Sequence, residues 1–469
     1  MKKNLSKHSK LLRVIVLVAV IPVLLYVLNI RTNFFEKASQ SLIGQKANIS
    51  VDINNLYPLN PTWVYLSQGG EERKGSLAPV LSKIQTLKPK YIRVDHIFDF
   101  YEPVKKDASG NLSFDWTLLD SEINDILETG AKPFLSLSYM PSAISRGSEI
   151  DIPASWQDWQ FTIQKTIEHI SGRGGLAISD VYYEVWNEPD LFGGFKLSGD
   201  KNYLTLYYYA SLGAQSASNT LPFKFGGPAT THLRRDWFDR LYSFVKRSSL
   251  RLDFYSWHLY SKQIVNYAKD FTNVKDYLLS FGDPANIEFI ITESGIDSEV
   301  NKDYDSIFSA IHTLALYTST FPREDKIFLF EIKDGPGERQ YWGRWGLLTH
   351  ENFGATVEKP RYYAISFLNE LEGSWTPVYG QGTWVTALAT KSEDQIIRIL
   401  LVNYDQYNIH WENAPVTMYN LPAGKYTVRK KKFLGETSEY KENINVSTWR
   451  TEILMNPNSA YIIEISPEK

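Results

Sequence analysis

The stretch Val181-Tyr182-Tyr183-Glu184-Val185-Trp186-Asn187-Glu188-Pro189-Asp190 joins a strand-like apolar run to a polar turn. Similar apolar runs recur along the chain, and segments with apolar residues at a 3.6-residue spacing lie between them. The strand-like runs occupy residues 63–66, 91–97, 133–139, 181–186, 223–226, 253–258, 287–292 and 326–332. Eight strand–helix units over about 310 residues predict an α/β fold, a closed (β/α)8 TIM barrel. An open doubly wound sheet is the structural alternative.

The pattern changes near residue 373, where short strand-like segments joined by turns replace the strand–helix alternation. This change predicts a barrel over residues 48–372 and a β-sandwich domain over residues 373–469. The run 49–54 is a candidate for one further sandwich strand, contributed from the front of the barrel. The basic run 429–432 is expected at a solvated strand edge, where charge discourages aggregation; contact with an anionic polymer is the alternative.

The N-terminal segment has the pattern of a membrane anchor. Residues 14–30 form a 17-residue run without any charge, and five basic residues precede it within residues 1–13. The positive-inside rule therefore predicts a cytoplasmic N-terminus, a transmembrane signal anchor at 14–30 and a linker at 31–47. The protein is then expected in the cell membrane, single-pass, with its catalytic domain on the non-cytoplasmic side. A cleaved signal peptide, which would give a secreted protein, is the competing interpretation.

Composition excludes several classes of protein. The 469 residues are 43% hydrophobic and 22% charged with a net charge of −3, so the chain is globular and lacks the basic footprint of a nucleic-acid binder. It contains no cysteine, which excludes disulfides, thiolate metal sites and cysteine nucleophiles. Aromatic residues reach 14%, which suits stacking on sugar rings and equally suits a large core.

Two carboxylates carry the functional argument. Glu188 follows the fourth predicted strand, and Glu293 ends the seventh in the run Phe289-Ile290-Ile291-Thr292-Glu293-Ser294-Gly295. In a TIM barrel the C-terminal ends of all strands open onto the face where active sites lie, so both acids can point into one pocket. Each also follows apolar residues, where an acid without a partner would be costly.

These motifs resemble the signature of retaining glycoside hydrolases of clan A, which pairs Trp-Asn-Glu-Pro at 186–189 with Thr-Glu-Ser-Gly at 292–295. Three further segments resemble glycoside hydrolase family 39 in particular: 133–141, Gly-Gly-Pro at 226–228, and Gly-Leu-Leu at 346–348 with Lys-Pro at 359–360. This family includes β-xylosidases, α-L-iduronidases and bacterial exopolysaccharide hydrolases.

The resemblance implies a role for each matched residue. Glu188 would be the general acid/base and Glu293 the nucleophile, about 5–5.5 Å apart as retention requires. Asn187 would hydrogen-bond the sugar 2-hydroxyl. Arg93 would hold the nucleophile ionised, and a purely structural ion pair is its alternative role. In the segment Trp257-His258-Leu259-Tyr260, Tyr260 would hydrogen-bond Glu293 and His258 would line the pocket.

Weaker candidates for sugar contacts lie at other strand ends and in the loop after the last strand. They are Asp95, His96, Tyr139, Glu331, Lys333, Asp334, Trp342 and Trp345. The histidines at 96, 232 and 258 show no metal-ligand spacing, so neither a metal nor another cofactor is predicted.

The sequence therefore predicts a membrane-anchored retaining glycoside hydrolase that cleaves O-glycosidic bonds of an extracytoplasmic poly- or oligosaccharide by double displacement. One alternative is a non-catalytic carbohydrate-binding or assembly protein on the same fold. The other is a transglycosidase in which a sugar hydroxyl replaces water. The sequence leaves the sugar, its linkage and the oligomeric state open.

Overall fold

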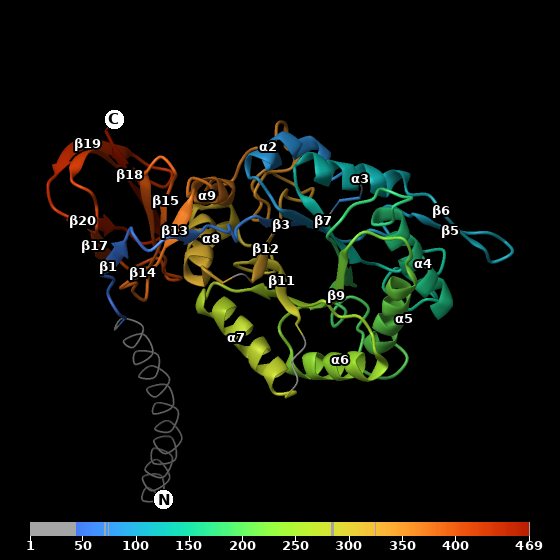
Figure 1. Cartoon of the computed structure of the whole chain (residues 1–469). Coiled ribbons are helices and arrows are strands. Elements are labelled where there is room, and N and C mark those ends of the chain that lie inside the picture. The colour runs from blue at the N-terminus through green and yellow to red at the C-terminus, as the bar shows by residue number, and fades with distance from the viewer. Residues whose placement is uncertain (1–43, 70–71, 74, 283–285, 324, 469) are drawn as a thin grey trace, which may run out of the picture.

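The computed structural model describes residues 44–468 except 70, 71, 74, 283–285 and 324. Figure 1 shows a barrel ringed by helices beside a second, all-β domain. Strands from both ends of the described chain build this second domain. The predicted anchor at 14–30 and most of the predicted linker lie outside the described residues. Within the described ranges, every helix is too short or too polar to cross a bilayer.

Eight parallel strands close into a barrel in the order β10-β11-β12-β3-β4-β7-β8-β9. They are β3 (Tyr65–Gln68), β4 (Tyr91–Val94), β7 (Lys132–Leu137), β8 (Val181–Val185), β9 (Phe223–Thr230), β10 (Phe254–Tyr260), β11 (Glu288–Gly295) and β12 (Lys326–Phe330). Each overlaps one of the eight predicted runs, so the prediction of a TIM barrel is confirmed. The open-sheet alternative is wrong because β9 pairs with β10 and closes the ring.

Helices cover the outside of the barrel: α2 (Leu81–Thr86), α3 (Thr117–Glu128), α4 (Trp156–Ile170), α5 (Tyr203–Ser216), α6 (Arg235–Ser248), α7 (Val265–Leu279), α8 (Ile307–Thr320) and α9 (Pro360–Leu368). Short 3-10 turns at Ala78–Val80, Lys302–Asp305 and Glu351–Phe353 precede some of them. The Ser155 hydroxyl accepts a hydrogen bond from the Asp158 amide and caps α4, as the sequence pattern predicts. A two-stranded excursion, β5 (Val104–Lys106) and β6 (Leu112–Phe114), precedes α3.

The second domain has two facing sheets, with a core of apolar side chains between them. One sheet has the order β14-β1-β17-β20, and the other has the order β19-β18-β21-β16-β15-β13-β2. The strands are β1 (Ile49–Asp52), β2 (Tyr57–Pro58), β13 (Ser374–Thr376), β14 (Val378–Tyr379), β15 (Val385–Lys391), β16 (Ile397–Asn403), β17 (Glu412–Tyr419), β18 (Gly424–Lys432), β19 (Thr437–Ile444), β20 (Thr448–Met455) and β21 (Ser459–Pro467). The predicted sandwich is confirmed as a sandwich-like domain, and β1 joins it from the front of the chain.

The two domains pack through α8 and α9, which lie between them in Figure 1. The Tyr404 hydroxyl donates to the carbonyl of Lys262 at 2.7 Å, and the Thr318 and Thr386 hydroxyls lie 2.6 Å apart. Apolar residues of the larger sheet, such as Leu400 and Ile462, belong to the same core as the barrel helices. The sandwich therefore supports the barrel from the side and leaves the strand ends free to form a site.

Candidate active site

A cavity of about 1120 Å³ opens at the C-terminal ends of the barrel strands. Six of the residues that line it stand at or just beyond the ends of five strands: Asp95, Tyr139, Asn187, Glu188, Tyr260 and Glu293. This position is the one at which TIM-barrel enzymes hold their catalytic groups. The predicted acids, which are far apart in the sequence, therefore share one pocket.

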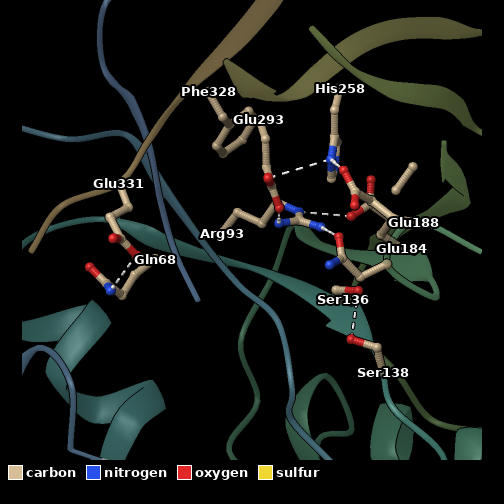
Figure 2. Close-up of polar contacts among 12 residues, drawn as sticks. Gln68, Arg93, Ser136, Ser138, Glu184, Glu188, His258, Glu293, Phe328 and Glu331 are labelled. Carbon is tan, nitrogen blue, oxygen red and sulfur yellow. Dashed lines mark hydrogen bonds and ion pairs between the residues drawn. The ribbon is translucent and has the colours of Figure 1, made fainter. Parts of the chain in front are cut away.

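Arg93 is the centre of the polar network beneath this cavity (Figure 2). Its side chain is fully buried on β4, between Ile92 and Val94. Its Nε donates to Glu184 at 2.8 Å, one Nη to Glu293 at 2.9 Å, and the other Nη to the Asn187 side-chain oxygen at 2.8 Å. The planar guanidinium thus holds three acceptors, two from β8 and the turn after it and one from β11.

Glu293 is almost completely buried on β11 and is held at both oxygens. One oxygen accepts from Arg93, and the other accepts from the Tyr260 hydroxyl at 2.9 Å. Burial raises the pKa of the Glu293 carboxyl, whereas the cations His258 and Arg93 act to lower it. Burial also raises the pKa of Tyr260 well above its ordinary value, so this phenol remains a proton donor. The site therefore supplies two donors to the ionised form of Glu293.

Glu188 reaches the cavity from the turn after β8. Trp186 and Glu188 both have left-handed backbones, with φ of 73° and 45°. Residues other than glycine rarely adopt this backbone conformation, and it persists only where surrounding contacts hold it. Here the Glu188 amide donates to the carbonyl of Ala229 at 2.9 Å, and the Trp186 indole donates to the carbonyl of Phe192 at 3.0 Å. The turn is thus fixed on both sides and directs the Glu188 carboxyl toward β10.

His258 connects the two acids. Its Nδ1 lies 2.8 Å from a Glu188 oxygen and 3.4 Å from a Glu293 oxygen. Burial lowers the pKa of His258, but the Glu293 and Glu188 carboxyls outweigh this effect and raise it above the ordinary value. One oxygen of each acid and the histidine nitrogen all lie within 4.8 Å of one another. The two carboxyls are therefore close enough to act on opposite sides of a single bond.

The expectation that His258 lines the pocket is corrected by the structure. Its side chain is fully buried, and it contributes nothing to the cavity wall because its ring lies behind the two carboxyls. Arg93 is likewise behind the wall rather than on it. Both residues reach a bound molecule through Glu188, Glu293 and Asn187 instead of touching it.

One side of the cavity is formed by polar and aromatic residues after β4 and β7. The Asn187 amide nitrogen donates to the Tyr139 hydroxyl at 3.1 Å, and the Tyr139 ring meets the His96 ring edge to face at 4.6 Å. His96 Nδ1 lies 2.8 Å from an Asp99 oxygen, and both residues line the cavity together with Asp95. The weaker candidates Asp95, His96 and Tyr139 are thus placed where a sugar could contact them.

The loop after β12 provides the other side. Trp345 lines the cavity, and its indole donates to the carbonyl of Asp297 at 3.1 Å. The Arg344 guanidinium stacks 3.4 Å above the Trp345 ring and also lines the cavity. This pair adds a flat, cationic surface to the cavity wall.

Four other candidates near β12 lie away from the cavity wall, and three of them, Glu331, Lys333 and Asp334, belong to buried polar networks. Glu331 accepts from the Gln68 amide at 3.1 Å (Figure 2), and Asp334 pairs with Lys359 at 3.0 Å. Lys333 pairs with Glu72 at 2.6 Å and Glu351 at 2.9 Å, and Trp342 covers Gly337. Burial raises the pKa of Glu331 well above its ordinary value, and the nearby Asp334 and Glu293 carboxyls raise it further.

Two groups of side chains have the atoms of a cation site. One is Glu188 with His258 and Glu293, and the other is Glu72 with His350 and Glu351. In the second group the Lys333 ammonium already pairs with both carboxylates, so its charge takes the place that a cation would fill.

Sequence reasoning missed the role of Glu184. It is fully buried on β8, one residue before the strand ends, and pairs with Arg93. The signal was an acid inside the apolar run Val181–Val185, because such a residue requires a charged partner. Arg344 was also missed, since neither spacing nor periodicity shows which loop residue turns toward a cavity.

Comparisons with known proteins find similarity to glycoside hydrolases. Residues 53–275 match the model of glycosyl hydrolases family 39, a range that includes Arg93, Glu188 and Tyr260 but ends before Glu293. A β-xylosidase from Caldicellulosiruptor saccharolyticus is 26% identical over 335 residues, which is 63% of this chain and 65% of that protein. A β-xylosidase from Geobacillus stearothermophilus is 23% identical over 305 residues, or 58% of this chain and 59% of that protein. The chain thus spans less than two thirds of the length of either relative.

Solved structures share the fold over most of the chain. A monomeric β-xylosidase from Caulobacter crescentus superposes with a TM-score of 0.75 at 19% identity, covering 90% of this chain and all of that one. A GH39 enzyme from Xanthomonas axonopodis pv. citri superposes with a TM-score of 0.74 at 20% identity, covering 90% and 98%. Both include the barrel and the sandwich-like domain in the aligned length.

Proposed function

We propose that this chain, which is like glycoside hydrolase family 39 in sequence and in fold, is a retaining glycosidase acting on O-glycosidic bonds. The observation that carries the proposal is the placement of Glu188 and Glu293 in one cavity with oxygens within 4.8 Å of one another. Retaining enzymes hold their two carboxyls about 5–5.5 Å apart, whereas inverting enzymes leave about 6.5–9.5 Å for a water molecule.

In the first step, an ionised oxygen of Glu293 attacks the anomeric carbon. The bond from that carbon to the glycosidic oxygen breaks, and the Glu188 carboxyl transfers its proton to the departing oxygen. The product is a glycosyl ester on Glu293 and a free alcohol. Arg93 and Tyr260 orient Glu293 for this attack, since each donates to a different oxygen of the carboxylate.

In the second step, Glu188 acts as the base. It takes a proton from water as the water oxygen attacks the anomeric carbon, and the bond to Glu293 breaks. Both residues return to their starting states. His258, in contact with both acids, stabilises whichever carboxyl carries the negative charge, and its raised pKa favours the charged ring that this task needs.

Asn187 is placed to bind the sugar during both steps. Its side-chain oxygen accepts from Arg93, so its amide nitrogen is fixed on the cavity side beside Tyr139. A hydroxyl next to the anomeric carbon would meet this amide. Such hydrogen bonds strengthen as positive charge develops on the sugar ring and so lower the barrier selectively.

The names of the relatives guide the choice of substrate. Both are β-xylosidases, so we expect aryl β-xylosides to be the first compounds to be turned over. The natural substrate is proposed to be a poly- or oligosaccharide on the non-cytoplasmic side of the cell membrane, because the charge-free run 14–30 follows five basic residues.

Leaving-group dependence tests the assigned roles. Glu188→Ala should lose about 10²- to 10⁴-fold in kcat/KM on an aryl glycoside with a basic leaving group, because protonation is lost. It should lose far less on a dinitrophenyl glycoside, which departs without a proton. Glu293→Ala should be inactive on both. Glu128→Ala, an exposed acid at the end of α3, is the matched control and should behave as wild type. An equal loss on both aglycons in Glu188→Ala would contradict the assignment.

A further inference from the structure

Four large apolar side chains project from one end of the sandwich-like domain. Their exposed fractions are 64% for Tyr407, 64% for Ile409, 58% for Trp411 and 61% for Leu454. We refer to these four residues as the apolar tip. Single exposed apolar residues are ordinary, but several on one surface mark a place where a protein, a membrane or a ligand binds.

The loop that carries the apolar tip is held in a defined shape. The buried Asp405 carboxylate accepts from the backbone amides of Tyr407, Ile409 and His410. This cluster of hydrogen bonds satisfies the acid and turns the side chains of Tyr407 and Ile409 outward. Trp411 leads directly into β17, and Leu454 stands on β20 opposite Asn413, on the outward face of the same sheet.

The described chain begins beside the apolar tip. Gly44 lies against the Trp384 ring, so closely that an added β-carbon would come within 2.3 Å. Trp384 stacks on His410 at 3.8 Å, and the amide of Ala47 donates to Glu412. In Figure 1 the blue start of the chain leads into β1 at the same end of the domain as β14 and β17. Residue 44, the first described residue, therefore lies at this surface.

We propose that the apolar tip rests in the headgroup region of the membrane. The inference rests on the membrane location put forward under Proposed function. The charge-free run ends at residue 30 and the described chain begins at residue 44. The 13 residues between them span at most about 45 Å when fully extended. Such a short tether keeps this end of the sandwich near the bilayer and raises the effective concentration of lipid around the tip.

The chemistry of the apolar tip suits a lipid surface. Tyrosine and tryptophan are the side chains enriched at the boundary between headgroups and acyl chains, and the aliphatic Ile409 and Leu454 lie beside them. The neighbouring acids Asp405 and Glu412 are buried. Glu452, the nearest exposed acid on β20, accepts from the Asn413 amide. Lys46 is exposed beside the tip and can meet an anionic headgroup.

The absence of cysteine from the sequence permits a direct test. Ile409→Cys and Leu454→Cys are each made in the full chain, labelled with a nitroxide, and reconstituted in vesicles of phosphatidylcholine with a minority of phosphatidylglycerol. Collision of the label with oxygen, which partitions into lipid, is compared with collision with a water-soluble nickel complex. Leu434→Cys in the sandwich and Val265→Cys on α7 are controls of similar exposure, 53% and 67%.

The proposal predicts a severalfold higher ratio of oxygen to nickel collisions at the two tip positions than at the two controls. Adding Trp411→Asp to the Leu454→Cys chain should lower its ratio toward the control values, because a charge opposes burial in lipid. Equal ratios at all four positions would overturn the proposal. So would shielding that occurs only with added polysaccharide, or a chain that does not associate with the vesicles.

Glycosidase activity distinguishes the proposed membrane contact from the proposed catalytic function. The apolar tip does not line the cavity, so every labelled variant should hydrolyse a soluble aryl glycoside at the wild-type rate. A chain that shows lipid contact but no glycosidase activity would refute the proposed function and leave the membrane contact standing.

Discussion

Replacing Arg93 separates its structural role from its chemical role. Arg93→Met keeps the bulk of the side chain but removes the donors to Glu184, Glu293 and Asn187. Two buried carboxyls then lose their shared cation. We expect two effects of different origin, one on the free energy of unfolding and one on the pH dependence of catalysis.

The magnitudes follow from the burial of the pair. Arg93 and Glu184 are both fully buried, and removing one partner of such a pair costs about 3–5 kcal/mol of stability. A neighbouring arginine typically lowers the pKa of a carboxyl by about 1–3 units. Losing it should therefore raise the pKa of Glu293, already raised by burial, still further. Since Glu293 must be ionised to attack, the acidic limb of kcat/KM should move to higher pH.

The double variant Arg93→Met with Glu184→Gln isolates the two effects. Neutralising Glu184 removes the unpaired buried charge, so most of the lost stability should return. The acidic limb should stay displaced, because Glu293 still lacks its cation. Urea unfolding gives the first quantity, and a pH profile of kcat/KM on an aryl glycoside gives the second. Glu184→Gln alone should leave the limb close to the wild-type position. An acidic limb in the double variant at the wild-type pH would refute the claim that Arg93 keeps Glu293 ionised.

Three further predictions concern single residues. Tyr260→Phe removes one donor to Glu293, so the acidic limb of kcat/KM should again move to higher pH, by less than in Arg93→Met; an unmoved limb would exclude this role. Wild type should lose stability as pH rises from the ordinary to the raised pKa of Glu331, by about 1.4 kcal/mol for each pH unit. Glu331→Gln lacks this loss, so its free energy of unfolding relative to wild type should increase with pH over that range. Urea titrations at several pH values test this prediction, and a gain independent of pH would contradict it. Burial lowers the pKa of His312 to about 3, so wild type should lose stability as pH falls from 6.5 toward 3; His312→Gln should flatten that slope, and an unchanged slope would show that other groups cause it.

The barrel could be predicted from sequence because its signal is repeated. Eight apolar runs alternate with helical patterns, and each run holds a strand of the closed sheet. The sandwich strand β20 was not predicted. Leu454 faces outward in it, among the inward residues Ile453 and Met455, and so interrupts the alternation that identifies a half-buried strand.

The site was predictable where it follows strand ends and motifs. Glu188, Glu293 and Tyr260 stand at such positions. The resemblance to family 39 drawn from their motifs is confirmed by the match over residues 53–275, and the solved structures share the fold. The sequence does not show how far each side chain lies from the cavity surface. Whether His258 lies on the wall or behind it depends on how far each strand extends past its neighbour, and the β10–β11 pairing has a register shift between Trp257 and His258 that no sequence pattern shows.

The anomeric configuration of the first product tests the central claim most directly. In the proposed mechanism the Glu293 carboxylate, within 4.8 Å of Glu188, forms a covalent bond to the sugar before water arrives. Proton NMR of an aryl β-glycoside during the first minutes of hydrolysis should therefore show the β-anomer of the free sugar, with the α-anomer growing only as mutarotation proceeds. Initial release of the α-anomer would mean that water attacks the substrate directly, and the double-displacement assignment of Glu188 and Glu293 would be wrong.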